Sequence, residues 1–202
     1  KIKGIFSSVN VALKRKNMYF NAMANSKRKD SKGGPYVPLK IKLDDPRIED
    51  KVSAIFKSVD DIEYYREVML SVPLGKPVWS YWVTSRYGTR SDPFKKTKAR
   101  HKGVDLASRT GNKVNVKGQG KVIRAEYAGA YGNLVVVDHG NGFQTKYAHL
   151  NKIYVKKGDR LEINDTVGEV GSTGRSTGPH LHYEVLYKGV NVDPLPFLKA
   201  KI

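Results

Sequence analysis

The amino-acid sequence predicts a mainly β, antiparallel domain preceded by an α-helical N-terminal segment. After Pro73, short β-type runs follow one another, each bounded by glycine or turn pairs. An Asn141-Gly142 pair joins two of these runs, which is a strong signal for a β-hairpin. Because runs so short and closely spaced favour antiparallel strands over βαβ units, we divide the chain into an N-terminal helical or linker segment, residues 1–72, and a β domain, residues 73–202.

Each expected strand is a run of residues with high β-propensity or alternating polarity. Polar and apolar residues alternate around Val114, whereas valines fill the run that begins at Leu134. The expected strands are residues 78–83, 113–116, 121–124, 134–137, 143–148, 167–170 and 181–186.

The segment before residue 73 has a helical pattern in two places. Residues 8–25 predict a short basic helix, and the polar, glycine-ended residues 27–34 predict a linker. A second helix is expected to start at Asp45-Pro46, because proline suits the first helical position and aspartate can cap it. An apolar stripe then follows one helical face: Ile48, Val52, Ile55, Phe56, Val59 and Ile62. We expect the stripe to pack against the β domain, the alternative being a helix that lies on a membrane.

The composition excludes several kinds of site. The chain has 202 residues, a formal net charge of +18 and no cysteine, so disulfides, cysteine-ligated zinc, iron–sulfur clusters and a thiol nucleophile are ruled out. The charge predicts association with polyanions: nucleic acid, an anionic membrane surface or acidic wall polymers. We expect no nucleic-acid partner, because the aromatic residues match no stacking motif.

The sequence shows no membrane-spanning pattern. No apolar run approaches the roughly 18–20 residues that a transmembrane helix needs, so we expect no transmembrane segment. The chain opens on a lysine without a signal-peptide pattern. We therefore expect a processed or trimmed chain whose targeting segment, if it has one, is missing.

All five histidines lie in the predicted β domain, where a metal site restricted to imidazole and carboxylate ligands suits zinc. His180 and His182 are alternate residues of a strand, so both can face one cleft. His101 and Asp105 form an H-x-x-x-D group where a loop enters a strand. Three protein ligands plus water would make a catalytic zinc site, leaving spare imidazoles for proton transfer, whereas four would make a structural site. His139, in the predicted hairpin turn, is expected to be structural.

Six segments of the chain carry a resemblance to a known family. They are residues 74–77 (LGKP), 84–88 (TSRYG), 101–105 (HKGVD), 131–140 (YGNLVVVDHG), 147–150 (YAHL) and 171–184 (GSTGRSTGPHLHYE). In their order and spacing, residues 73–198 resemble the lysostaphin-type, or LytM-type, family of zinc endopeptidases, which cut cell-wall peptides. The resemblance implies a mainly antiparallel β domain with an open groove.

The resemblance also implies the roles of five side chains. By it, His101, Asp105 and His182 are the ligands of one zinc ion per chain. His149 and His180 are the catalytic histidines that flank the bound water and stabilise the tetrahedral intermediate.

The substrate that the resemblance implies is the stem peptides of peptidoglycan, cleaved in the cell envelope by a periplasmic or secreted enzyme. Tyr131, Asn133 and Arg86 are expected to contact this substrate, although many relatives carry a small residue at the position of Arg86. The alternative is a non-catalytic LytM-type module that binds or activates other cell-wall hydrolases. The zinc content of the purified protein would separate these two possibilities.

Overall fold

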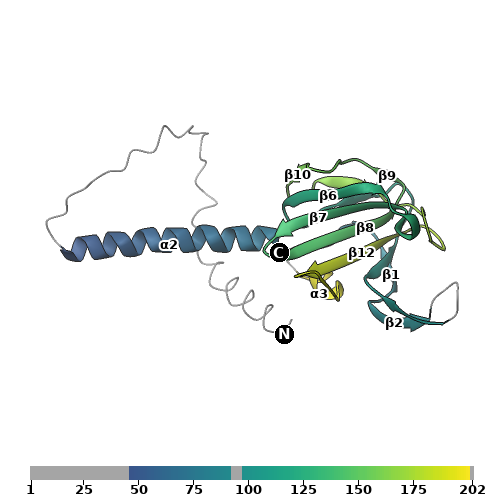
Figure 1. Ribbon diagram of the computed structural model, residues 1–202, viewed down its shortest axis with the longest axis horizontal. Helices are drawn as coiled ribbons and strands as arrows, with labels where there is room; N and C mark the ends of the chain where they lie inside the picture. Colours follow the sequence, from purple (N-terminus) through teal and green to yellow (C-terminus); the bar gives the residue numbers. More distant parts are fainter. Residues whose placement is uncertain (1–45, 92–96, 201–202) are drawn as a thin grey trace. The chain divides into compact units, whose positions relative to one another are not determined.

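The computed structural model describes residues 46–91 and 97–200 (Figure 1). The helix and the linker expected at residues 8–25 and 27–34 lie outside these residues. The described elements are α2 (Pro46–Ser71), β1 (Trp82–Ser85), β2 (Gly88–Ser91), β3 (Lys98–His101), β4 (Val104–Ala107), β5 (Lys113–Asn115), β6 (Gly120–Tyr127), the 3-10 helix η1 (Gly129–Tyr131), β7 (Asn133–Gly140), β8 (Phe143–Leu150), β9 (Lys152–Ile153), β10 (Arg160–Leu161), β11 (Thr166–Glu169), β12 (His180–Tyr187), β13 (Val190–Val192) and α3 (Leu195–Leu198).

The strands confirm the mainly β, antiparallel fold. Eight strands form one sheet in the order β1-β4-β12-β8-β7-β6-β10, with β13 paired to β12. A three-stranded sheet, β5-β11-β9, and a two-stranded ribbon, β2-β3, complete the set. All strand pairings among the described residues are antiparallel.

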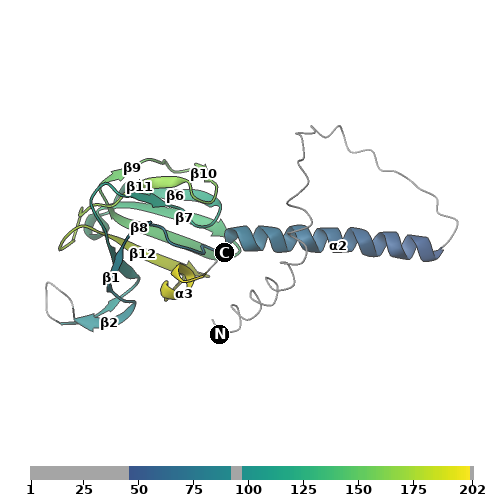
Figure 2. The ribbon, with the colours of Figure 1, turned by 180° about the vertical axis from the view of Figure 1, so that it is seen from behind.

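The three-stranded sheet packs beside the large sheet. Gly168 of β11 lies against the Leu150 side chain of β8, and Figure 2 shows β9 and β11 near the β6–β7 side of the large sheet. Leu106 and Leu181, which are paired across β4 and β12, are fully buried. Burial of each such side chain contributes roughly 1.5–3 kcal/mol. Because side chains alternate along a strand, the residues on either side of Leu181 face the opposite side of the sheet.

The hairpin predicted at residues 141–142 joins β7 to β8. Gly140 pairs with Phe143, so the loop between the strands has two residues. Asn141 has φ 49° and Gly142 has φ 82°. A type I′ turn requires positive φ at both positions, which asparagine and glycine tolerate best.

The strand expected at residues 78–83 is only partly present, because β1 begins at Trp82. The preceding residues cross from β5 to the edge of the large sheet. The Pro77 carbonyl accepts a hydrogen bond from the Asn115 amide at 2.8 Å, and the Ser80 carbonyl accepts one from the Ser108 hydroxyl at 2.7 Å. The backbone of residues 77–80 is therefore used in a crossing segment rather than in a strand.

Helix α2 begins at Pro46, where the sequence predicts a helix start, and ends at Ser71. Its last turn is attached to the β domain, since the Leu70 carbonyl accepts a hydrogen bond from the Gln119 amide at 2.8 Å. The expectation that the apolar stripe packs against the β domain is wrong for Ile55 and Phe56. Their side chains are 61% and 67% exposed and do not pack on the domain. Among residues 46–91 and 97–200, no helix has the length and apolarity needed to cross a membrane.

His139 is a structural residue, as expected, although it lies in β7 and not in the turn. It is buried, its Nδ1 donates a hydrogen bond to the Gln119 carbonyl at 2.9 Å, and its Nε2 lies 2.7 Å from the Thr145 hydroxyl. Burial lowers the pKa of His139 below its ordinary value, although its backbone hydrogen bonds oppose this shift. The folded protein therefore holds the imidazole in its neutral form.

We expect His139→Gln to reduce the dependence of stability on pH. In the unfolded wild type, the imidazole binds a proton below about pH 6.5, whereas in the folded protein it stays neutral. The free energy of unfolding therefore falls as the pH falls, by up to about 1.4 kcal/mol per pH unit. The variant lacks this contribution, and it is less stable at pH 8 by about 1–3 kcal/mol because its buried hydrogen bonds are lost. Urea denaturation from pH 8 to pH 5 measures both effects. Parallel stability curves for the two proteins would contradict the assignment.

Candidate functional site

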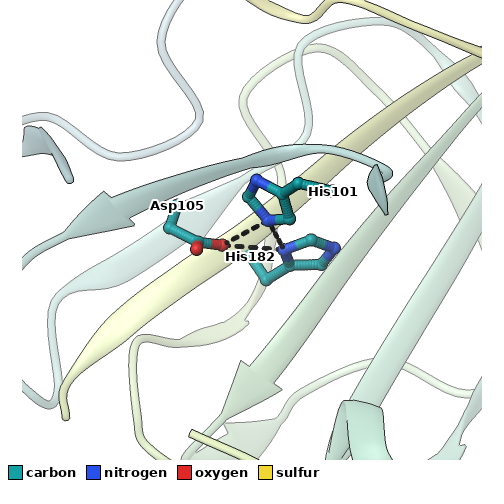
Figure 3. A group of neighbouring side chains, drawn as sticks. All are labelled: His101, Asp105 and His182. Carbon is teal, nitrogen blue, oxygen red and sulfur yellow. Dashed lines mark hydrogen bonds and ion pairs between the residues drawn. The ribbon is translucent and has the colours of Figure 1, made fainter. Parts of the chain in front are cut away.

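The candidate site begins with the register of two neighbouring strands. Asp105 of β4 pairs directly with His182 of β12, so both side chains point to the same face of the sheet. His101 ends β3, four residues before Asp105, and turns back over the pair (Figure 3). Gly103 permits this close approach, because a Cβ at that position would lie 2.3 Å from the Tyr183 carbonyl oxygen. The sequence prediction placed His101 at a loop end, whereas the structure places it at the end of a strand.

The three side chains bring one donor atom each to a common point. His101 Nε2 lies 3.0 Å from Asp105 Oδ1 and 3.1 Å from His182 Nδ1, and His182 Nδ1 lies 2.8 Å from Asp105 Oδ1. Ligands of a tetrahedral zinc ion with bonds of about 2.0–2.1 Å are separated from one another by about 3.3 Å. The triangle of donor atoms therefore has nearly the size that zinc requires.

The hydrogen bonds of the outer imidazole nitrogens determine which atoms face this point. His101 Nδ1 donates to the Arg86 carbonyl at 2.8 Å, and His182 Nε2 donates to Glu184 Oε1 at 3.1 Å. In the neutral imidazoles, the opposite nitrogens then carry lone pairs. Two nitrogen lone pairs and a carboxylate oxygen thus converge, an arrangement that a cation stabilises. The chemistry of these three donor atoms therefore fits a metal ion.

Asp105 is held in its ionised form. Burial opposes this charge, but the contacts with His101 and His182, which donate to the carboxylate when their imidazoles are protonated, outweigh burial and keep the pKa of Asp105 far below its usual value. The second carboxylate oxygen, Oδ2, lies 3.3 Å from the guanidinium of Arg90, which β2 contributes. The carboxylate can therefore present one oxygen to the donor triangle while the other is paired with Arg90.

His149 and His180 lie beside the donor triangle. Their rings are 4.8 Å apart between centroids, and the His149 ring is 5.9 Å from that of His182. His149 Nδ1 donates to the Thr173 carbonyl at 2.7 Å, and His180 Nδ1 donates to the Gly178 carbonyl at 2.8 Å. His180 Nε2 is consequently turned toward the site, where it lies 3.7 Å from Asp105 Oδ1.

The position of His149 is unusual in two respects. Its φ of 61° lies in the left-handed region, which non-glycine residues adopt at a cost that tertiary contacts must offset. Burial, together with the smaller effect of the nearby His180, lowers the pKa of His149 to about 4, although the hydrogen bond to Thr173 opposes the shift. The imidazole is therefore neutral near pH 7 and offers an unprotonated nitrogen.

All five side chains line one open pocket of about 200 Å³. The five predicted site residues in this pocket are His101, Asp105, His149, His180 and His182. The other residues that line it are Arg90, Ala130, Tyr131, Arg175, Ser176 and Thr177. Four of the five are buried, whereas His180 is half-buried. Side chains that are far apart in the sequence thus form a single concave site.

The three residues predicted to contact substrate lie in different environments. Tyr131 lines the pocket, and its hydroxyl donates to Glu184 Oε1 at 2.8 Å. Asn133 does not line the pocket; its side chain donates to the Leu150 carbonyl at 2.9 Å. Arg86 is exposed and reaches the site only through its carbonyl, which orients His101.

Two charged residues that contact the predicted zinc ligands were missed by the sequence analysis. Arg90 lies in the β2–β3 ribbon, and no local pattern links it to Asp105. Glu184 could have been found, because it continues the alternation of His180 and His182 along β12. Its fully buried carboxylate accepts hydrogen bonds from His182 and Tyr131 and pairs with Lys146 Nζ at 3.1 Å. Burial opposes ionisation of Glu184, but these partners hold its pKa at about 2.

Comparisons with known proteins agree with this geometry. Residues 99–194 match the model of Peptidase family M23. The chain is 41% identical over 128 residues to "Peptidoglycan DD-endopeptidase ShyA" of Vibrio cholerae, an alignment that covers 62% of this chain and 29% of that protein. The chain thus spans less than a third of the length of this relative.

Solved structures show the same similarity. A zinc-containing peptidase from Vibrio cholerae is 35% identical, with a TM-score of 0.54, over 65% of this chain and 40% of that one. The catalytic domain of the antimicrobial peptidase lysostaphin from Staphylococcus simulans is 31% identical, with a TM-score of 0.55, over 59% of this chain and 93% of that domain. The similarity to lysostaphin therefore extends over nearly the whole of a catalytic domain.

We expect Glu184→Gln to weaken zinc binding about 10- to 100-fold, because the charged acceptor that fixes the orientation of His182 is lost. Competition with a chromogenic chelator at pH 7.5 measures the affinity, and circular dichroism checks that the variant is folded. Glu162→Gln, which removes the same charge at an exposed position, is the matched control and should bind zinc like the wild type. Equal zinc affinity of a folded Glu184→Gln protein and the wild type would contradict the orienting role.

Proposed function

Because the chain belongs to Peptidase family M23, we propose that it is a zinc endopeptidase that hydrolyses the peptide cross-links of peptidoglycan. One observation carries the proposal: three side chains suited to hold a metal ion and two further imidazoles line the same open pocket. A peptidase of this kind needs a metal ion, an accessible position for water and groups that handle protons. The pocket offers residues for each requirement.

His101, Asp105 and His182 would hold one zinc ion per chain. Two imidazoles and one carboxylate are ligands that zinc prefers, and three protein ligands leave a coordination position for water. When bound, zinc supplies polarisation of the scissile carbonyl and lowers the pKa of the attacking water. The contacts of Arg86 and Glu184 support this assignment, because they orient both imidazoles before metal binding.

His149 and His180 would handle protons and orient the reacting groups. Each imidazole donates its Nδ1 hydrogen to a backbone carbonyl, so each Nε2 is the nitrogen able to accept a proton in the pocket. One can take the proton of the attacking water, and the protonated form can then donate a hydrogen bond to the developing oxyanion. The fixed carbonyls of Thr173 and Gly178 hold both rings in this orientation.

We propose a D,D cross-link between peptidoglycan stem peptides as the bond that is cut, since the relative ShyA carries the name of a DD-endopeptidase. Such a substrate places the enzyme in the cell envelope. Residues 73–202 would form the peptidase domain, with residues 1–72 as an N-terminal regulatory segment. A non-catalytic module would not need two additional imidazoles aimed at the metal position, so the pocket favours the enzyme.

We expect His180→Ala to retain zinc and fold but to lose about 10²- to 10⁴-fold in turnover, because a group that handles protons is removed. The assay incubates the protein with purified peptidoglycan and identifies the released fragments by mass, with and without a chelator. His139→Gln, whose buried histidine lies outside the pocket, is the control and should cleave like the wild type at pH 7.5.

Three results would each contradict one part of the proposed function. Digestion by His180→Ala at the wild-type rate would refute the role of this histidine. Fragments released equally in the presence of a chelator that removes the zinc would refute the metal-dependent reaction. Fragments cut at another peptide bond would refute the D,D specificity alone.

A further inference from the structure

Both tryptophans of the chain are exposed, and they lie three residues apart. Trp79 is 94% exposed and Trp82 is 73% exposed. Tryptophan is on average a highly buried residue, and exposed aromatic surface often marks a binding site. Trp79 belongs to the segment that crosses from β5 to the edge strand β1, and Trp82 is the first residue of β1.

A recess of about 350 Å³ lies at Trp79. Lys76, Lys113 and Lys117 line it, together with the amide side chains of Asn112 and Asn115. Its volume is in the range of roughly 300–1,000 Å³ that small-molecule sites occupy. An indole, three ammonium groups and two amides suit a ligand that combines a flat apolar face with hydroxyl or amide groups and negative charge.

The strand register places Trp82 on the face of the catalytic pocket. Trp82 pairs with Ala107, and Ala107 pairs with His180. Directly paired residues point to the same face of a sheet, so Trp82 and His180 share a face and are separated by two strand spacings, about 9–10 Å. Trp79 is three residues before Trp82, a backbone distance of at most about 11 Å. Trp82 therefore lies within about 11 Å, between backbones, of both Trp79 at the recess and His180 in the pocket.

We propose that Trp79, its recess and Trp82 form a second binding site, for the glycan strand that carries the cross-linked peptides. This inference rests on the proposed function. The C–H face of a pyranose ring can stack on an indole, its hydroxyl and acetamido groups can bond to Asn112 and Asn115, and the carboxylates of sugar residues that bear no peptide complement the lysines. A glycan held at this site would deliver its attached peptide to the neighbouring pocket.

A membrane surface is the competing ligand for tryptophan and lysine side chains. Residues that enter a membrane interface lie on an apolar face that is buried among the lipids. Here the lysines and amides line a recess, which a single sugar residue can enter and a flat bilayer cannot. The observations therefore favour the glycan.

The test is a fluorescence titration of the full chain with peptide-free glycan strands of peptidoglycan, whose muramic acid residues carry free carboxylates. Because these strands carry no peptide, the zinc-loaded protein has no bond to hydrolyse in them, and binding is measured without turnover. Because the chain has only two tryptophans, its tryptophan emission reports on the proposed site alone. We expect a saturable change in emission and, by affinity electrophoresis with the same strands, about tenfold weaker binding by Trp79→Ala, as for loss of one stacking contact.

Tyr127→Ala is the matched control, since Tyr127 is also an aromatic residue with 64% exposure but lies on β6. It should bind the glycan strands like the wild type. No saturable change, or equal binding by Trp79→Ala and the wild type, would overturn the proposal. Binding to phosphatidylglycerol vesicles that requires Trp79, without binding to glycan, would replace it with a membrane site.

The proposal of a second site and the proposed function can be contradicted independently of each other. A protein that cleaves a sugar-free cross-linked peptide but does not bind the glycan strands would contradict only the second site. A protein that binds the strands through Trp79 but cleaves no peptide would contradict only the peptidase proposal.

Discussion

The candidate site depends most on the convergence of two imidazole nitrogens and one carboxylate oxygen within 3.1 Å of one another. The direct pairing of Asp105 with His182 across β4 and β12 produces this convergence, and His101 completes it from the end of β3. Lone pairs held so close repel one another unless a proton or a cation lies between them. The buried strands that fix the register therefore also impose a local electrostatic requirement that a metal ion can satisfy.

The surrounding residues hold the imidazoles in the tautomers whose unprotonated nitrogens face the site. The Arg86 carbonyl and the Glu184 carboxylate each accept the outer hydrogen of one imidazole, and the Thr173 carbonyl does the same for His149. Glu184 is itself held by Tyr131 and Lys146, so its charge is stabilised although it is fully buried. Loss of such an outer partner typically weakens metal binding about 10- to 100-fold. Preorganisation here resides in hydrogen bonds made before metal or substrate binds.

The period of strand residues and the chemistry of turn residues made much of the fold, and the shared face of two site histidines, predictable from sequence. The two-residue period of a strand places His180 and His182 on one face, and Asn141-Gly142 specifies its hairpin. Arg90 could not be predicted in this way, because its contact with Asp105 depends on how the β2–β3 ribbon lies over another strand. The apolar residues of α2 had the period of a packed face, yet Ile55 and Phe56 are exposed, since periodicity does not specify a partner.

Equilibrium dialysis of the metal-free chain against Zn²⁺ at pH 7.5 tests the central claim most directly. The account predicts one tightly bound zinc ion per wild-type chain, and a loss of affinity of at least about 10³-fold in Asp105→Ala, because one of three protein ligands is missing. Failure of the folded wild-type chain to bind zinc, or equal affinity of a folded Asp105→Ala chain, would show that the converging side chains do not form a zinc site.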